Sequence, residues 1–215
     1  FNDLHETLQG HLQASLPARA TMLFSSLRGL DEDEATTRYL QTVAHEAGFF
    51  TDYGYLDEAG FADRDGVFNR DGQRADLWFK LYPWDLLAAE ELEVARLLAG
   101  IQRDGHTRVL NPAYSAVLHS KGLLPVLHEL FPDSPYLLPA SAQPLPAGRQ
   151  VRKGVFSRQG AQVSLIEPGR RGLAEMGADA DKAIYQAYVP LPQDAAGRRY
   201  QAGVYVAGEP CALGI

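Results

Sequence analysis

The feature that most constrains this fold is an apolar run, a helical pattern and a second apolar run in close succession. The run ATMLFSSL at 20–27 has the length of a strand, and so does FFTDYGYL at 49–56. Between them, DEDEATTRYLQTVAHEAG at 31–48 places its apolar residues on one helical face, with Asp31 as a candidate cap and Gly48 as a candidate stop. Strand, helix and strand of these lengths predict a βαβ unit with a parallel sheet, and ligands usually bind at the carboxyl ends of such strands.

The rest of the chain predicts a mixed α/β protein whose second half carries antiparallel strands. VFNRDGQRADLWFKLY at 67–82 predicts a hairpin that turns at Asp71-Gly72, and Trp84 begins a helical pattern. Helical stretches flank Lys121, and a Pro-rich segment then precedes the strand patterns QVRKGVF, AQVSLIE and AIYQAYVPLP. Two domains are expected. They are a first domain at 1–105 and a second region at 106–215, the latter divided into a helical part at 106–140 and a sheet at 148–215.

Composition excludes several classes of partner. The chain has 215 residues, 46% of them hydrophobic, and a formal charge of -7 with scattered basic residues, so a nucleic-acid partner is not expected. No apolar run is long enough to span a bilayer, so no membrane partner is expected either. The single cysteine, Cys211, offers no disulfide and no thiolate cluster, which predicts a cytoplasmic protein. Because the chain begins at Phe1 on a helical pattern and stops inside a strand pattern, we expect it to be a piece of a longer protein.

The stretch VRKGVFSRQGAQV at 151–163 is the first candidate site. Side chains alternate along a strand, so Lys153 shares a face with apolar residues, where an ammonium group has to reach water or meet an anion. Gly160, with Ser157 and Arg158 nearby, could let backbone N–H groups close on phosphate oxygens. The alternative interpretation is that Lys153 is a charge on an edge strand and SRQG an ordinary hairpin turn.

Two further features allow both a structural and a functional interpretation. Lys121, between Ser120 and Gly122, could project from a helix end toward a pocket, or it could be a solvated loop lysine. The acidic run at 31–34 is typical of a helix N-terminus that uses the helix dipole. The sequence has no Gly-x-Ser-x-Gly elbow, no Gly-Lys-Ser/Thr phosphate loop and no zinc spacing around its histidines.

Taken together, these segments resemble the glutathionylspermidine synthase family of ATP-grasp amide ligases. The resemblance runs nearly end to end through FNDLHETL, DEDEATTRYL, LWFKLYPWDLL, LNPAYSAVLHSKGLLPVLHELFP, YLLPA, VRKGVFSRQGAQVSLIE and IYQAYVPLP. It implies a pre-ATP-grasp domain followed by parts of an ATP-grasp fold. It also implies a reaction in which ATP phosphorylates a carboxylate and an amine displaces the resulting acyl phosphate.

The resemblance also assigns residues by position. Those it implies for ATP binding are Lys121, Lys153, Ser157, Arg158, Gln159, Gly160, Gln186, Ala187, Tyr188, Val189 and Gln201. Glu32 and Asp33 match an acidic pair that faces the peptide substrate, while capping of the helix remains an equal alternative for both. The chain departs from the family at Lys153-Gly154, where family members usually have Lys-Pro.

The expected function is that of an ATP-dependent ligase that joins a small-molecule or peptide acid to an amine. The family's Mg²⁺ ligands correspond to positions before Phe1 and its catalytic arginine to a position after Ile215, so no metal ligand or catalytic residue is assigned within the chain. These 215 residues alone are therefore expected to be inactive in ligation. The alternatives are a non-catalytic ATP-binding module with a degenerate site, or a scaffold.

Overall fold

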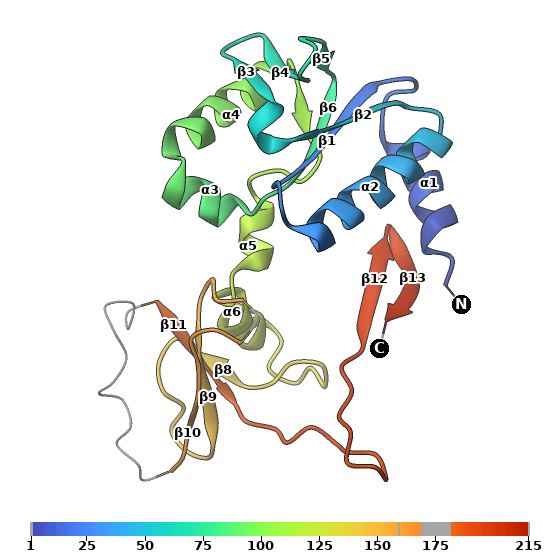
Figure 1. The fold of residues 1–215 in the computed structure, drawn as a ribbon. Coiled ribbons are helices and arrows are strands. Elements are labelled where there is room, and N and C mark those ends of the chain that lie inside the picture. The colour runs from blue at the N-terminus through green and yellow to red at the C-terminus, as the bar shows by residue number, and fades with distance from the viewer. Residues whose placement is uncertain (1, 159, 169–181, 215) are drawn as a thin grey trace. The chain divides into compact units, whose positions relative to one another are not determined.

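The computed structural model describes residues 2–158, 160–168 and 182–214, and the chain divides into two compact units. Unit 1 comprises Phe1–Ala113 and Tyr200–Ile215, and unit 2 comprises Tyr114–Arg199. Figure 1 follows the chain from blue to red through both units. The chain therefore leaves unit 1 once and returns to it once.

Unit 1 is built around a parallel sheet with the strand order β2-β1-β6-β7. Its strands are β1 (Thr21–Ser26), β2 (Phe50–Tyr55), β6 (Leu77–Leu81) and β7 (Arg108–Val109). Strand β1 pairs in parallel with β2 on one side and with β6 on the other. Helix α2 (Asp31–Glu46) connects β1 to β2, so the predicted βαβ unit is confirmed.

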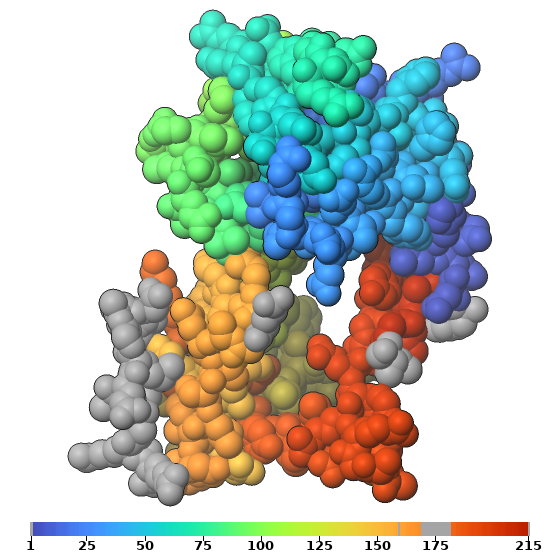
Figure 2. Space-filling view, in the orientation of Figure 1, coloured from blue at the N-terminus to red at the C-terminus, as the bar shows by residue number. Residues whose placement is uncertain are grey.

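Helices cover both faces of this sheet (Figure 1). Helices α1 (Leu4–Ser15) and α2 lie on one face, and α3 (Trp84–Glu90) and α4 (Leu92–Asp104) lie on the other. Because side chains alternate along β1, Met22 and Phe24 join the core beneath α2, whereas Ser25 accepts a hydrogen bond from Trp78 Nε1 at 3.0 Å. In the space-filling view, the blue-to-green part of the chain forms one continuous surface (Figure 2).

Helix α2 starts differently from the expectation but ends as expected. Asp31 is the first helical residue rather than the cap: Leu30 precedes the helix, and no side chain caps it. Four carboxylates, Asp31 to Glu34, occupy the first turn, where the helix dipole stabilises negative charge without a capping hydrogen bond. At the other end Gly48 has a φ of +93° and donates to His45 O, so the predicted glycine stop is confirmed.

The predicted hairpin around Asp71-Gly72 is present but shorter than expected. Strand β4 (Gly66–Phe68) pairs with β3 (Gly60–Ala62) and, across the turn, with β5 (Arg74–Ala75). The segment LWFKL was expected to continue the hairpin, and it forms β6 of the parallel sheet instead. The chain changes sheets because Asp76 N donates to Thr21 O, which brings the following residues alongside β1.

The C-terminal strands β12 (Gly203–Ala207) and β13 (Glu209–Gly214) form an antiparallel hairpin within unit 1. The sequence grouped them with the preceding strands. They lie instead against the N-terminal segment, because Asp3 N donates to Cys211 O at 3.0 Å and Leu213 N donates to Asn2 Oδ1 at 3.2 Å. Contacts so distant in sequence leave no periodic pattern that could predict them.

Unit 2 combines two short helices with an antiparallel sheet. The helices are α5 (Ser115–His119) and α6 (Leu123–Leu130), and the strands are β8 (Ala140–Ser141), β9 (Gln150–Gly154), β10 (Val163–Ile166) and β11 (Ala183–Ala187). The strand order is β10-β9-β11-β8, and every pairing is antiparallel. The α/β fold class, with a parallel sheet followed by antiparallel sheets, is confirmed.

One charged side chain lies inside unit 1. Lys80 on β6 is 1% exposed, its Nζ donates to Tyr82 O at 2.6 Å, and it lies 4.0 Å from the centroid of the Trp84 ring. Burial lowers the pKa of Lys80 from 10.5 to about 8. Because the unfolded chain restores the ordinary lysine pKa, the unfolded state binds more protons than the folded state between these two values.

We therefore expect the free energy of unfolding to rise as the pH is raised from about 8 toward 10.5, relative to a Lys80→Met variant. The difference between the two proteins should change by about 3 kcal/mol across this window. Urea unfolding at a series of pH values measures it, and subtracting the variant removes the titration of the tyrosines. Parallel pH profiles for the two proteins would contradict a pKa lowered by burial.

Candidate functional site

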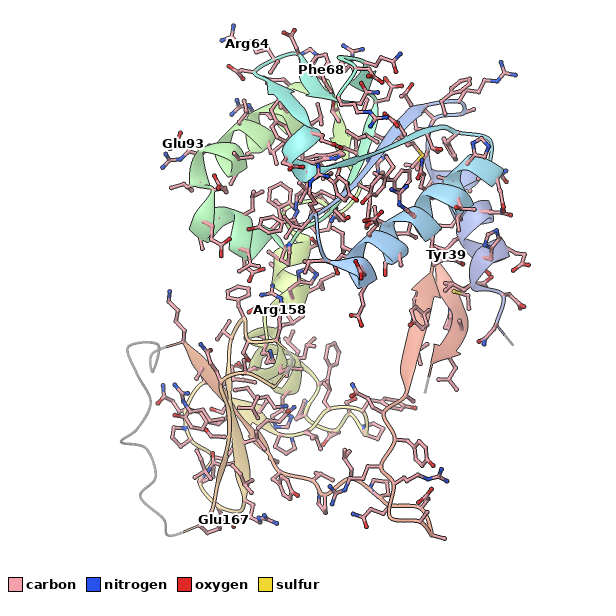
Figure 3. The ribbon with its side chains drawn as sticks, viewed as in Figure 1. Tyr39, Arg64, Phe68, Glu93, Arg158 and Glu167 are labelled. Carbon is pink, nitrogen blue, oxygen red and sulfur yellow. The ribbon has the colours of Figure 1, made fainter. Side chains whose placement is uncertain are left out.

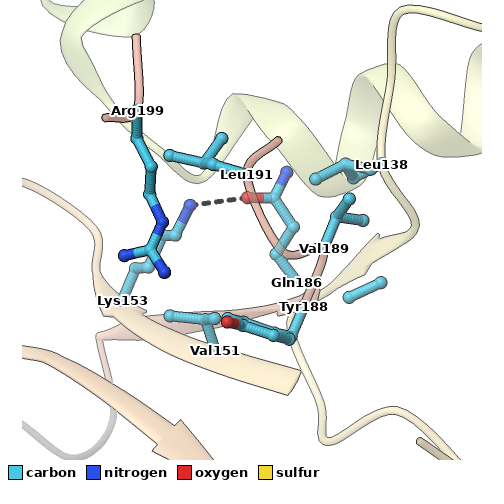
Figure 4. Close-up of a pocket in the computed structure, with 9 residues that line it drawn as sticks. Leu138, Val151, Lys153, Gln186, Tyr188, Val189, Leu191 and Arg199 are labelled. Atoms are coloured by element: carbon cyan, nitrogen blue, oxygen red, sulfur yellow. Dashed lines mark hydrogen bonds between the residues drawn. The ribbon is translucent and has the colours of Figure 1, made fainter. Parts of the chain in front are cut away.

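A cavity of about 270 Å³ lies beside β9 and β11 in unit 2 (Figure 4). Its lining residues are Leu138, Val151, Lys153, Gln186, Ala187, Tyr188, Val189, Leu191 and Arg199. Six of these nine residues are aliphatic or aromatic, and the two charged side chains of the lining, Lys153 and Arg199, are both cations. A cavity of this composition suits a ligand that combines an apolar or aromatic part with an anionic group.

Lys153 lies on a central strand of the sheet. Strand β9 has β10 on one side and β11 on the other, so the interpretation of Lys153 as an edge-strand charge is wrong. Val151 and Lys153 are half-buried and share the cavity face, while Arg152 is buried on the opposite face. Lys153 Nζ donates to Gln186 Oε1 on β11 at 2.6 Å (Figure 4). The ammonium group thus meets a neutral acceptor beside the cavity.

The segment from Gln186 to Val189 forms a second wall. Two of its backbone N–H groups have acceptors within the protein: Ala187 N donates to Pro139 O at 2.8 Å, and Tyr188 N donates to Arg149 O at 2.9 Å. Val189 N–H has no acceptor within the described part of the chain. A backbone donor of this kind, in the wall of a cavity, is able to pair with a ring nitrogen of a ligand.

Arg149 fixes the aromatic ring in this wall. Its guanidinium carbon lies 4.3 Å from the centroid of the Tyr188 ring, and the same guanidinium donates to Glu167 Oε1 through Nε at 3.0 Å. The ring is therefore held by a cation–π contact in addition to the backbone hydrogen bond between the same two residues. This arrangement keeps Tyr188 in place along the cavity without a ligand.

Lys121 is tied to the loop that follows β9. Its backbone N–H donates to Val155 O at 2.8 Å, and its Nζ donates to Ser157 O and, at 3.2 Å, to Ser157 Oγ. Lys121 is thus a half-buried turn residue held by this loop, and its role in binding phosphate stays a prediction. Its side chain is outside the cavity lining, but its charge is close enough to act on Lys153.

The remaining predicted loop residues lie between β9 and β10. Ser157 Oγ donates to Gly154 O at 3.0 Å, Arg158 Nη1 donates to Phe156 O at 3.2 Å, and Gly160 has a φ of +77° that favours glycine. Figure 3 labels Arg158 at this end of the unit and Glu167 at the opposite end. These loop residues are not among those that line the cavity, and Gln159 lies outside the described residues.

The departure from the family at Lys153-Gly154 has a structural counterpart. A Cβ atom added to Gly154 would lie 2.0 Å from Gln162 Oε1, so the Gln162 side chain fills the space that a larger residue would take. Gly154 N also donates to Gln162 O at 3.2 Å, a hydrogen bond that proline cannot make. The strand end is thus held by Gln162 rather than by a proline ring.

The electrostatics of the cavity favour an anion. The pKa of Lys153 is lowered, first by burial of its ammonium group and then by the positive charge of Lys121. Arg199, which the sequence reasoning missed, brings a further positive charge to the lining. No motif marks Arg199, because it lies in an irregular segment after β11. An anionic ligand would offset the repulsion between Lys153 and Lys121.

Three predicted residues lie in unit 1. Glu32 and Asp33 occupy the first turn of α2, and Gln201 precedes β12. The neighbouring Glu34 receives hydrogen bonds from Arg38 Nε at 2.7 Å and from the Tyr55 hydroxyl at 2.8 Å, which together lower the pKa of that carboxyl. Glu32 and Asp33 thus stand at the start of a helix whose first turn is held in place.

The parts of the chain that the structure describes hold no group of three or more histidine, cysteine, aspartate or glutamate side chains that could bind a metal ion. In the same residues, no helix is both long and apolar enough to cross a membrane. The Mg²⁺ cofactor implied by the family resemblance stays a prediction.

These observations define an α/β protein with a cation-lined cavity on an antiparallel sheet. The family model described as "Glutathionylspermidine synthase preATP-grasp" matches residues 1–215, and the chain belongs to this family. The resemblance seen in the sequence is thereby confirmed.

One curated protein is similar to this chain in sequence, and one solved structure is similar to it in fold. A Haemophilus influenzae protein, provisionally named an acid–amine ligase, is 29% identical over 180 residues, which make up 78% of this chain and 43% of that relative. The chain thus spans less than half of that relative's length. A crystal structure titled as a RimK domain ATP-grasp protein from Sphaerobacter thermophilus has a TM-score of 0.43 at 17% identity, over 80% of this chain and 66% of that one.

Replacing Lys121 by methionine tests whether the two lysines share one electrostatic environment. Because a nearby like charge disfavours the charged form, we expect the pKa of Lys153 to rise in Lys121→Met. NMR of lysine side chains measures it directly, since the sequence contains only four lysines. The matched control is Lys182→Met, which removes an exposed lysine of the same unit. An unchanged Lys153 titration in Lys121→Met would place the two ammonium groups too far apart to bind one anion.

Proposed function

We propose that this chain carries the nucleotide-binding part of an ATP-dependent carboxylate–amine ligase. The observation that supports it most is the cavity on β9 and β11. Its charged side chains, Lys153 and Arg199, are both cations, and the N–H of Val189 is without an acceptor in the described part of the chain. The family of the chain and the name of its Haemophilus influenzae relative agree with such a role.

The cavity suits each part of ATP. Val151, Leu191 and the ring of Tyr188 offer apolar and aromatic surface for an adenine ring. Val189 N–H can donate to a ring nitrogen, and Lys153 supplies an ammonium group for the phosphates. Lys121, through its contact with Ser157, would draw the loop after β9 toward the same phosphates. The assignments of Arg158, Gln159, Gly160 and Gln201 as further nucleotide contacts belong to the same proposal.

The proposed reaction joins an acid to an amine in two steps. A carboxylate oxygen of the acid attacks the γ-phosphorus of ATP, the bond to the β,γ-bridging oxygen breaks, and ADP leaves with the electron pair. The amine nitrogen then attacks the carbonyl carbon of the acyl phosphate, loses a proton, and inorganic phosphate leaves. The described lysines contribute by binding the phosphate oxygens and offsetting their negative charge. Glu32 and Asp33 are proposed to bind the amino group of a peptide substrate.

The Lys153→Met variant tests the nucleotide assignment. Methionine keeps an unbranched stem and removes the charge, so we expect a similar thermal midpoint and an ATP affinity lower by roughly ten- to a hundredfold, the value of a charge-assisted hydrogen bond. Calorimetric titration with ATP measures the affinity, and Lys182→Met is the control for loss of a lysine from the same unit. Equal ATP affinity in wild type and Lys153→Met would remove Lys153 from the site.

Nucleotide choice tests the Val189 assignment independently of charge. Adenine N1 accepts a hydrogen bond whereas guanine N1 carries a proton, so a backbone N–H in the wall should favour ATP over GTP by about tenfold or more. Competition between the two nucleotides measures the ratio. Similar affinities for ATP and GTP would mean that binding depends on the phosphates alone.

Ligation itself is assayed as ADP formation by the full-length protein with candidate acids and amines. ATP binding without any ADP formation would instead favour a non-catalytic module.

A further inference from the structure

A second cavity, of about 260 Å³, lies in unit 1 at the carboxyl ends of its parallel strands. The lining residues that matter here are Phe61, Trp78, Lys80, Tyr82, Leu87 and Val94. Leu27 follows β1, Leu56 follows β2, and Lys80 is near the end of β6, while α3 and α4 supply the opposite wall. Open α/β sheets commonly bind their ligands at this edge.

Lys80 gives this cavity its chemical character. Its ammonium group has three N–H donors, and the described residues offer it one hydrogen-bond acceptor, Tyr82 O at 2.6 Å. The face of the Trp84 ring, 4.0 Å away, adds a cation–π contact but no negative charge. No carboxylate of the described residues forms an ion pair with Lys80, although the side chain is 1% exposed. A buried ammonium group of this kind gains most from an anionic partner.

The acidic groups nearby are already engaged or lie at the rim. Asp57 pairs with Arg28 Nη2 at 3.3 Å, and the Tyr82 hydroxyl donates to Glu90 Oε2 at 2.6 Å, which raises the pKa of Tyr82 to about 12. Glu91, between α3 and α4, is exposed. These are the titratable groups that face the cavity from η1 (Leu56–Glu58), β6 and the α3–α4 side. None of them neutralises Lys80 directly.

We propose that this cavity binds a small molecule with a carboxylate head and an apolar body, and that Lys80 receives the carboxylate. The side chains of Phe61, Trp78, Leu87 and Val94 would enclose the apolar body. The carboxylate would accept the ammonium N–H donors that the protein leaves without acceptors. The inference rests on unit 1 alone and does not depend on nucleotide binding, and its test contains no ATP.

The chain provides its own optical probe for this site. It has only two tryptophans, Trp78 in the cavity wall and Trp84 beside Lys80 Nζ, so its tryptophan fluorescence reports on this region. The probes are 4-phenylbutyrate and the matched alcohol, 4-phenylbutan-1-ol, which differ in the anionic head. We expect both to alter the fluorescence, with the carboxylate binding about tenfold more tightly because it forms charge-assisted hydrogen bonds.

Two variants and one titration separate the contribution of the Lys80 charge from that of the apolar cavity. Lys80→Met should abolish the preference for the carboxylate while the alcohol still binds, and Val94→Phe should weaken both probes by filling the cavity. In the wild type, the advantage of the carboxylate should decline as the pH rises above about 8, where Lys80 loses its proton. This titration needs no variant to fold.

Equal affinities for the carboxylate and the alcohol in the wild type at pH 7 would overturn the proposal. So would a carboxylate preference that persists in folded Lys80→Met, since another cation would then be responsible. Absence of binding by either probe to the wild type, at concentrations up to their solubility, would also refute it. None of these outcomes bears on ATP, so the nucleotide proposal stands or falls separately.

Discussion

The fold of unit 1 depends on strand β1 having a parallel partner on each side. A strand in that position has no free edge, and both of its faces must be covered by other elements. The α2 crossover covers one face, and the α3–α4 pair covers the other. Once both layers are in place, the polar strand ends meet at a single edge of the sheet. The Lys80 cavity lies at that edge, as a consequence of the strand directions.

The two cavities share one physical principle although they lie in different units. Each places a lysine on a strand next to apolar surface and gives it an uncharged acceptor, Gln186 Oε1 for Lys153 and Tyr82 O for Lys80. In both cases burial is the first cause of a lowered lysine pKa. A carboxylate partner from the protein would have made each lysine a structural ion pair. Its absence among the described residues is what leaves each cavity suited to an anionic ligand.

Local patterns were sufficient to predict the elements whose partners are close in sequence. The βαβ unit, the glycine stop at Gly48 and the β9–β10 hairpin follow from hydrophobic period and turn residues. The pairing of β6 with β1 could not be predicted in this way, because a single alternating run fits a hairpin and a parallel sheet equally well. The packing of the β12–β13 hairpin on the N-terminal segment, through Asp3 and Cys211, also required the three-dimensional structure.

Some residues of the candidate site could be predicted from the sequence and others could not. Lys153 and the segment from Gln186 to Val189 were predicted, and they line one cavity. Arg199 was missed because its segment carries no periodicity, and Lys80 was missed because its pattern is that of an ordinary amphipathic strand. Burial without a carboxylate partner is a property of three-dimensional packing, and it leaves no signature in the sequence.

The return of the chain to unit 1 has a consequence for how the protein folds. Unit 2 lies in the sequence between two segments that belong to unit 1. It therefore forms a long loop of unit 1, and this loop is closed when the β12–β13 hairpin packs against α1. While unit 2 is unfolded, closing that loop carries the entropic cost of a long flexible chain, and folding of unit 2 removes much of this cost. The order in which the units form is therefore coupled through chain connectivity. Synthesis adds to this coupling, because the hairpin that belongs to unit 1 emerges from the ribosome after unit 2.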